Sequence, residues 1–187
     1  DWNSWEWQLS NSIKTLSDLE RILELSESEK EALSLYRECL PLRITPYYMS
    51  LIDPKDPLQG IRKSVVPVMD EHKKSRGEAE DPLGEDHDSP VNGLVHRYPD
   101  RVLFLATNFC STYCRYCTRS RMVGDKSHSS RQQWEKAFEY IEHHKEIRDV
   151  LISGGDPLTM PDESIDYLLS RLRKIPHVEF IRIGTKV

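Results

Sequence analysis

The chain has 187 residues, of which 37% are hydrophobic and 30% are charged, and its formal net charge at pH 7 is −5. That size fits one domain or part of one, and the acidic balance argues against the clustered basic face of a nucleic-acid-binding protein. The sequence has no signal peptide and no apolar run long enough to span a membrane, so we expect a reduced, soluble, cytoplasmic protein.

The first half of the chain has the pattern of short helices. Ser17–Glu20 and Ser26–Glu29 are candidate capping boxes, each followed by leucines at helical spacing. Five prolines between residues 41 and 67 then predict short helices and turns. Residues 70–92 are very polar and predict a loop or linker. We therefore expect a helical amino-terminal region over residues 1–92.

The second half alternates strands with helices. This order predicts an α/β fold with a parallel sheet and right-handed crossovers, whose ligand site lies at the carboxyl ends of the strands. Because the chain stops after a strand, with no helix following, we expect a fragment cut inside an α/β unit. The predicted elements are strand 101–106, helix 130–145, strand 149–152, helix 160–174 and strand 179–183.

Three cysteines, Cys110, Cys114 and Cys117, follow the first of these strands within eight residues, and Tyr116 precedes the last. Thiolates so close in sequence can wrap one compact inorganic cluster. A [4Fe–4S] cluster usually takes four cysteine ligands, so three would leave one iron open to a substrate or cofactor.

Other readings of the cysteines remain open at this point. A structural zinc site would need a fourth ligand, for which the sequence offers only the isolated His128. A disulfide framework does not fit four cysteines of which three are clustered. The fourth, Cys39, lies in a helical pattern and is expected to be a small buried apolar residue.

A second motif, Ser153–Leu158, follows the second predicted strand. Its adjacent glycines, Gly154 and Gly155, let the backbone approach a ligand closely, and the Asp156 carboxylate can hold an ammonium group. An ordinary strand-to-helix turn is the alternative. In a parallel sheet, this motif and the cysteines would face the same mouth.

A third run, His96–Arg101, leads into the first strand. Arg97, Tyr98 and Arg101 put two guanidinium forks and a phenol within five residues, a set that could hold a phosphate and flank an aromatic ring. The alternative is a turn at Pro99–Asp100 with surface arginines.

The cysteine run resembles the cluster-binding loop of the radical S-adenosylmethionine (radical SAM) enzymes, and Ser153–Leu158 resembles their glycine-rich motif. Together with His96–Arg101, Cys117–Arg121 and Ile181–Thr185, they make the chain from about residue 40 onward resemble the lysine 2,3-aminomutase family. The resemblance implies a partial radical SAM (β/α)6-type barrel, truncated at its carboxyl end, over residues 93–187, preceded by the helical region 1–92.

The resemblance also implies an isomerase with three cofactors: a [4Fe–4S] cluster, S-adenosylmethionine and pyridoxal phosphate. Members of the family use an adenosyl radical to move an amino group from the α to the β carbon of an amino acid. By residue, it implies cluster ligands Cys110, Cys114 and Cys117; S-adenosylmethionine contacts Tyr116, Ser153, Gly154, Gly155 and Asp156; pyridoxal phosphate contacts Arg97, Tyr98 and Arg101; and Arg119 on the substrate carboxylate.

The substrate stays open between lysine, glutamate and a related α-amino acid, because Tyr116, Ser120 and Met122–Val123 depart from the residues usual in lysine-acting members. The resemblance further implies a homo-oligomer that takes electrons from a flavodoxin- or ferredoxin-type donor. The Schiff-base lysine is expected beyond residue 187. Two alternatives remain: another radical SAM enzyme that lacks pyridoxal phosphate, and a non-catalytic iron–sulfur or zinc-binding module.

Overall fold

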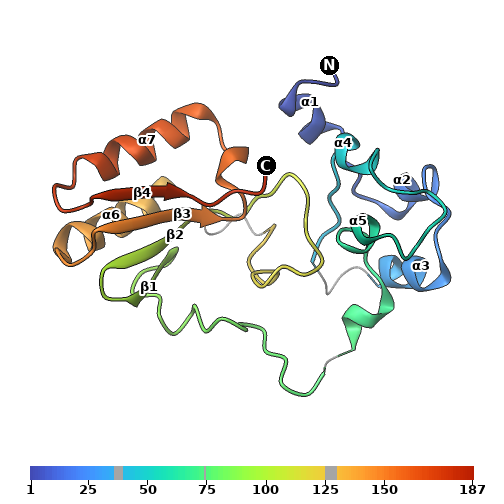
Figure 1. The fold of residues 1–187 in the computed structure, drawn as a ribbon, viewed down its shortest axis with the longest axis horizontal. Helices are drawn as coiled ribbons and strands as arrows, with labels where there is room; N and C mark the ends of the chain where they lie inside the picture. Colours follow the sequence, from blue (N-terminus) through green and yellow to red (C-terminus); the bar gives the residue numbers. More distant parts are fainter. Residues whose placement is uncertain (36–39, 74, 125–129) are drawn as a thin grey trace. The chain divides into compact units, whose positions relative to one another are not determined.

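The computed structural model describes residues 1–35, 40–73, 75–124 and 130–187 (Figure 1). These residues form two compact units, one of residues 1–82 and 111–121 and the other of residues 83–110 and 122–187. Cys39 and His128 lie outside the described residues. The expected division into domains 1–92 and 93–187 stays a prediction.

The first unit contains short helices joined by turns, as expected for the amino-terminal region. An isolated antiparallel bridge between Ile13 and Ile44 holds its connecting segments together, and both residues are buried. Its elements are α1 (Trp5–Ser10), α2 (Leu16–Glu20), α3 (Glu27–Ser34), α4 (Pro46–Met49), α5 (Gly60–Lys63) and the 3-10 helix η2 (Met69–His72).

Helices α2 and α3 each begin at a capping box. Ser26 caps α3 and forms a capping box with Glu29, as predicted. The predicted cap Ser17 is wrong, because α2 begins two residues earlier with Thr15 as its cap and Asp18 as the box partner. Capped there, α2 buries Leu19 completely.

The second unit is a four-stranded sheet in the order β1-β2-β3-β4 (Figure 1). Strands β2, β3 and β4 are parallel, as predicted, whereas β1 is antiparallel to β2 and was not predicted. The fold class is therefore α/β. Its elements are β1 (Leu94–Tyr98), β2 (Arg101–Thr107), α6 (Arg131–His143), β3 (Asp149–Gly154), the 3-10 helix η3 (Pro157–Thr159), α7 (Asp162–Arg173) and β4 (Phe180–Ile183).

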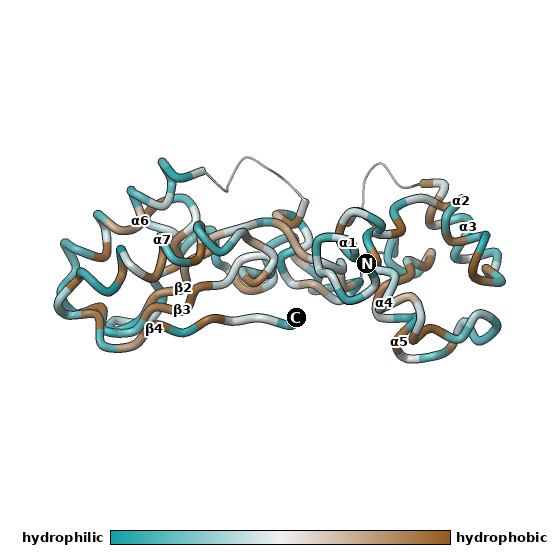
Figure 2. The backbone as a smooth tube through the Cα atoms, turned by 90° about the horizontal axis from the view of Figure 1, so that it is seen from above, coloured by the Kyte–Doolittle hydropathy of each residue, from teal (hydrophilic) through white to brown (hydrophobic). Residues whose placement is uncertain are grey.

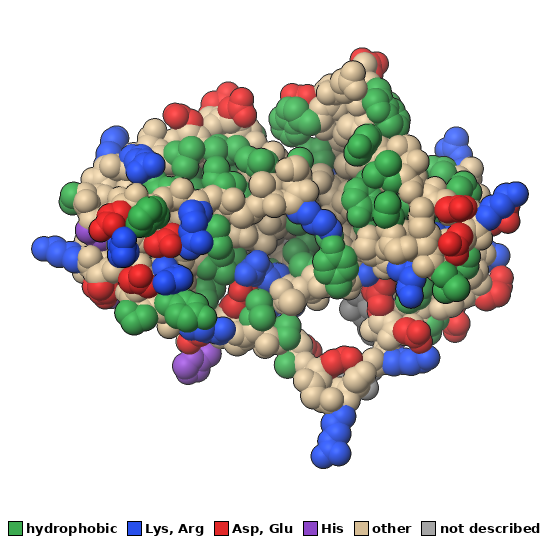
Figure 3. Space-filling view, in the orientation of Figure 1, with side chains coloured by type: hydrophobic (Ala, Val, Ile, Leu, Met, Phe, Trp, Pro, Cys, Tyr) green, Lys and Arg blue, Asp and Glu red, His purple; other side chains and the backbone are tan. Residues whose placement is uncertain are grey.

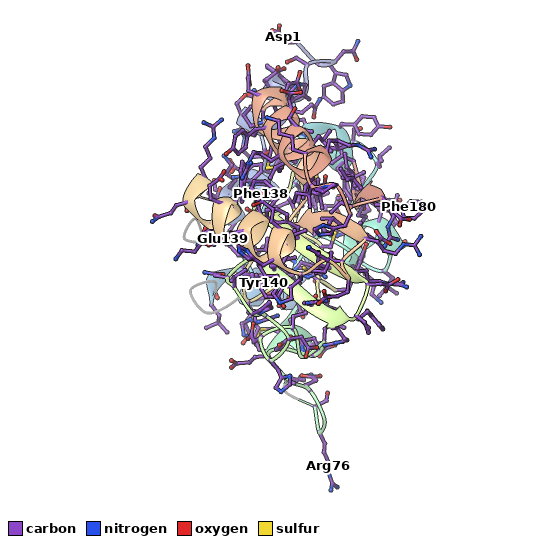
Figure 4. All side chains as sticks on the ribbon, turned by 90° about the vertical axis from the view of Figure 1, so that its left-hand side faces the viewer. Asp1, Arg76, Phe138, Glu139, Tyr140 and Phe180 are labelled. Atoms are coloured by element: carbon purple, nitrogen blue, oxygen red, sulfur yellow. The ribbon has the colours of Figure 1, made fainter. Side chains whose placement is uncertain are left out.

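Helices α6 and α7 lie on the same face of the sheet, as Figure 2 shows. Alternate residues of β2, such as Val102 and Phe104, are buried with them in one apolar core. The Phe104 and Phe138 rings meet edge to face, with centroids 5.5 Å apart. Phe138 is buried while its neighbour Glu139 is exposed, and Figure 4 labels the two on α6. The side chains that alternate with these core positions lie on the opposite face of the sheet.

On the face drawn in Figure 3, acidic and basic side chains intermingle. Among the described residues, no helix combines the length and the apolar character needed to cross a membrane.

Candidate functional site

The two chemical motifs of the second unit meet at the carboxyl ends of β2 and β3. These strands pair in parallel register up to Thr107 and Gly154. Beyond them, the Gly155 amide donates to the Thr107 carbonyl (2.5 Å) and the Asp156 amide donates to the Phe109 carbonyl (2.7 Å). Cys110 follows directly, so the structure brings the first cysteine and the glycine-rich turn to the same edge of the sheet.

The adjacent glycines are required by their own chain. Gly154 has φ +126°, and a Cβ on it would overlap the backbone of Thr107. A Cβ on Gly155 would overlap the backbone of Phe109. The glycines therefore allow the turn to approach the segment that precedes Cys110, whatever ligand they also contact. Ser153 is half-buried at the end of the strand.

Asp156 ties this turn to the segment after β4. Its carboxylate accepts from the Leu158 amide (3.1 Å), the Thr185 hydroxyl (2.7 Å) and the Lys186 amide (2.7 Å), and the residue is only 4% exposed. Its predicted contact with the ammonium of S-adenosylmethionine stays a prediction. What the structure shows is that Asp156 joins the ends of two parallel strands.

Asp156→Asn is expected to lower the free energy of unfolding by about 1–3 kcal/mol, because the amide keeps only one of the two accepting oxygens and one of these partly buried hydrogen bonds to a charged group is lost. Chemical denaturation of the full-length protein measures the loss. Asp166→Asn, on the exposed face of α7, is the matched control and should change stability by no more than about 0.5 kcal/mol. Equal stabilities of the two variants would contradict the joining role.

The other two cysteines belong to the first unit. Cys114 and Cys117 are half-buried and lie in one turn, in which the Cys117 amide donates to the Cys114 carbonyl (3.1 Å). Tyr116, which lies between them in the sequence, is 64% exposed, and Arg119, two residues after Cys117, is half-buried. Among the described residues, no three Cys, His, Asp or Glu side chains are already gathered as a metal-ligand set. The donor set of three accessible thiols nevertheless suits an iron–sulfur cluster, whose irons prefer thiolates.

The third predicted set lies at the other end of β2. Arg97 donates to the Asp88 carboxylate (2.5 Å) and to the Leu83 carbonyl, and the hydrogen bond to Asp88 raises the pKa of the Arg97 guanidinium. Tyr98 pairs with Arg101 across the turn between β1 and β2 and is 57% exposed.

Arg101 lies beside Tyr98, with its guanidinium carbon 5.4 Å from the centroid of the phenol ring, and it also bonds to Asp100 (3.1 Å). At roughly 3.3 Å per residue, β2 separates this set from Thr107 by about 20 Å. The structure thus groups Tyr98 with Arg101, and it places both at the opposite end of β2 from Cys110.

Sequence reasoning assigned no role to Thr185, Lys186 or Arg115, because the partners of these residues lie far away in the sequence. The first two act through Asp156, as described above. The position of Arg115 between Cys114 and Cys117 could have marked it in the sequence as a residue of the site.

Comparison with known proteins relates the chain to one enzyme family. Residues 104–187 match the family described as the Radical SAM superfamily. Over 99% of its length the chain is 51% identical to an L-lysine 2,3-aminomutase of Bacillus subtilis, and over its whole length it is 48% identical to one of Clostridium subterminale. It is also 41% identical to a glutamate 2,3-aminomutase of Clostridioides difficile over its whole length.

The matches cover only part of each relative. They span 40% of the Bacillus protein, 45% of the Clostridium subterminale protein and 44% of the Clostridioides protein. The chain therefore spans less than half the length of these relatives.

Proposed function

Because this chain belongs to the lysine 2,3-aminomutase family of radical SAM proteins, we propose that the protein is an amino acid 2,3-aminomutase, an isomerase that moves an amino group from C2 to C3. The sheet with its two helices is part of the radical SAM fold. The observation that carries the proposal is the junction of β2 and β3, where Cys110 and the glycine-rich turn share one edge of the sheet inside the matched region.

The proposal assigns the cofactors to named residues. A cluster with an open iron and S-adenosylmethionine would supply radical chemistry, and pyridoxal phosphate would supply an electron sink. The cluster would be held by Cys110, Cys114 and Cys117, S-adenosylmethionine by Tyr116 and Ser153–Asp156, and pyridoxal phosphate by Arg97, Tyr98 and Arg101.

The chain's own residues bind and orient. Arg97 and Arg101, which hydrogen-bond to Asp88 and Asp100, would exchange these carboxylates for a phosphate, and the exposed Tyr98 ring beside Arg101 would offer a face to an aromatic ring. The fork of Arg119 would take the substrate carboxylate. Leu103 and Leu151 alternate with the core positions of β2 and β3 and therefore lie on the sheet face away from the helices. Their apolar side chains would keep water from that face of the sheet.

Several finer points belong to the proposal. The substrate is an α-amino acid, with lysine favoured over glutamate by the higher identity to the lysine-acting relatives. The protein is proposed to act as a cytoplasmic homo-oligomer, to take electrons from a flavodoxin- or ferredoxin-type donor and to bind no nucleic acid.

The test is cofactor content and product analysis on the full-length protein purified without oxygen. It should hold about four irons per chain at this site, as a cysteine-ligated cubane does, and cleave S-adenosylmethionine on reduction. It should also show the absorbance of a pyridoxal imine and convert isotope-labelled lysine or glutamate to the 3-amino isomer. Replacing the three cysteines together by Ala should remove the iron and the cleavage.

The double variant Arg97→Ala and Arg101→Ala separates this function from its nearest rival. It should lower pyridoxal phosphate occupancy and leave the iron content intact, whereas Arg182→Ala, another arginine paired with an aspartate, should change neither. A protein that holds the cluster and cleaves S-adenosylmethionine without ever binding pyridoxal phosphate is a radical SAM enzyme of another reaction. A colourless protein with one zinc ion is not a radical enzyme.

A further inference from the structure

Arg115, between Cys114 and Tyr116, is almost completely buried in the first unit, with its side chain 5% exposed. Its Nε donates to both carboxylate oxygens of Glu71 (3.1 and 3.0 Å), and its Nη2 donates to Oε2 of the same carboxylate (2.5 Å). Its Nη1 donates to the Leu40 carbonyl (2.9 Å). One guanidinium thus connects the cysteine loop to two segments that lie 44 and 75 residues away in the sequence.

The partners of Arg115 are themselves held in place. Glu71 lies in η2 and also accepts from the Val68 amide (3.2 Å), which orients its carboxylate. Leu40 is buried. The backbone amide of Arg115 donates to the Ser64 carbonyl just after α5 (2.8 Å), so backbone and side chain of the same residue are both fixed.

The rest of the loop is attached to the same unit. The Tyr113 amide donates to the Arg43 carbonyl (3.0 Å), and the Arg43 guanidinium lies 5.7 Å from the Tyr113 ring centroid. The Thr45 amide donates to the Thr112 hydroxyl (3.4 Å). Segments of the amino-terminal region therefore hold the chain from Thr112 to Arg115, on both sides of Cys114.

We propose that Arg115 is a positioning residue, which with Glu71 fixes the loop so that the Cys114 and Cys117 thiols are presented together to a cluster. The inference rests on the proposed function in one respect, that the loop holds a cluster. It extends that function by giving the amino-terminal helical unit a part in the iron–sulfur site. Lysine cannot replace Arg115 here. A single ammonium group cannot form two parallel hydrogen bonds to the Glu71 carboxylate and also donate to the Leu40 carbonyl.

The experiment compares Arg115→Ala, Arg115→Lys and Glu71→Gln with wild type in the full-length, anaerobically reconstituted protein. Iron release to a chelator and the electron paramagnetic resonance spectrum of the reduced cluster are measured. Loss of a residue that orients metal ligands typically costs 10–100-fold in affinity, so Arg115→Ala should lower cluster affinity by about 10-fold or more and change the spectrum. Arg115→Lys should not restore either, and Glu71→Gln should lie between Ala and wild type.

Arg182→Ala is the matched control. Arg182 also forks onto a carboxylate, that of Asp149 in the second unit, and it should behave like wild type. If wild type binds no cluster, the proposed function fails and this inference fails with it. If wild type binds a cluster and Arg115→Ala keeps the same chelator resistance and spectrum, only the positioning role is overturned. Should Arg115→Ala fail to fold, Glu71→Gln decides, and a wild-type result for that variant rejects the inference.

Discussion

Arg62→Ala is expected to lower the free energy of unfolding by about 3–5 kcal/mol, because it leaves the buried Glu29 carboxylate without its counter-ion. The two side chains are 0% and 2% exposed and form a forked pair with both N–O distances at 2.8 Å. The remaining guanidinium protons are donated to backbone carbonyls of Asp53, Pro54 and Glu24. Denaturant unfolding followed by circular dichroism measures the loss.

Arg182→Ala again supplies the matched control, since the Arg182 side chain is 51% exposed. An exposed pair of this kind contributes about 0–1 kcal/mol. Comparable losses in the two variants would mean that the Arg62–Glu29 pair is not buried in solution.

The same pair makes stability depend on pH. Burial alone would raise the pKa of the Glu29 carboxyl, but hydrogen bonds from Arg62 and Ser26 outweigh burial and hold this pKa below its ordinary value of 4.5. A lowered pKa in the folded state gives stability that is fully present above pH 4.5 and lost as the pH falls through the folded value. The difference in unfolding free energy between wild type and Glu29→Gln should therefore be constant near neutral pH and shrink in acid.

Gly154→Ala is expected to cost about 3 kcal/mol or more. A positive φ costs a residue with a side chain about 1–3 kcal/mol, and the added Cβ also meets the backbone of Thr107, which cannot move without disturbing the pairing of β2 with β3. Gly155→Ala should likewise displace Phe109 and with it Cys110. Thermal unfolding and iron content of the full-length protein measure both effects.

Gly184→Ala is the matched control, in the same unit. The atoms nearest to a Cβ there are side-chain atoms of Leu151 and Ser153 at 3.4 Å and the Ile152 carbonyl oxygen at 3.7 Å. Its cost should not exceed about 1 kcal/mol, the typical value for a point substitution. A Gly154→Ala variant as stable as Gly184→Ala would show that the turn can adopt another path.

Much of the second unit could be predicted from the sequence because its strands are short apolar runs separated by amphipathic helices. Strand β1 could not, because Leu94–Tyr98 ends in polar residues and belongs to a hairpin rather than to the alternating pattern. In α2, two overlapping capping patterns compete, Thr15 with Asp18 and Ser17 with Glu20. Only packing decides between them, by burying Leu19.

The candidate site shows the same limit. The cysteines, the glycines and Asp156 could be selected because their residue types and spacing carry chemistry. The partners of Asp156 follow from the register of β4 on β3, and those of Arg115 follow from the folding of a region 44 to 75 residues earlier. No local pattern encodes either set.

The hydrogen bonds of Asp156 also bear on the order in which the second unit folds. Those from Thr185 and Lys186 join residues 29 and 30 positions apart, and they require β4 to be paired with β3 across the intervening α7. The entropy lost in closing a loop of this length opposes such contacts early in folding. We therefore expect them to form after the transition state of folding. Loss of the Asp156 carboxylate is accordingly expected to speed unfolding more than it slows folding.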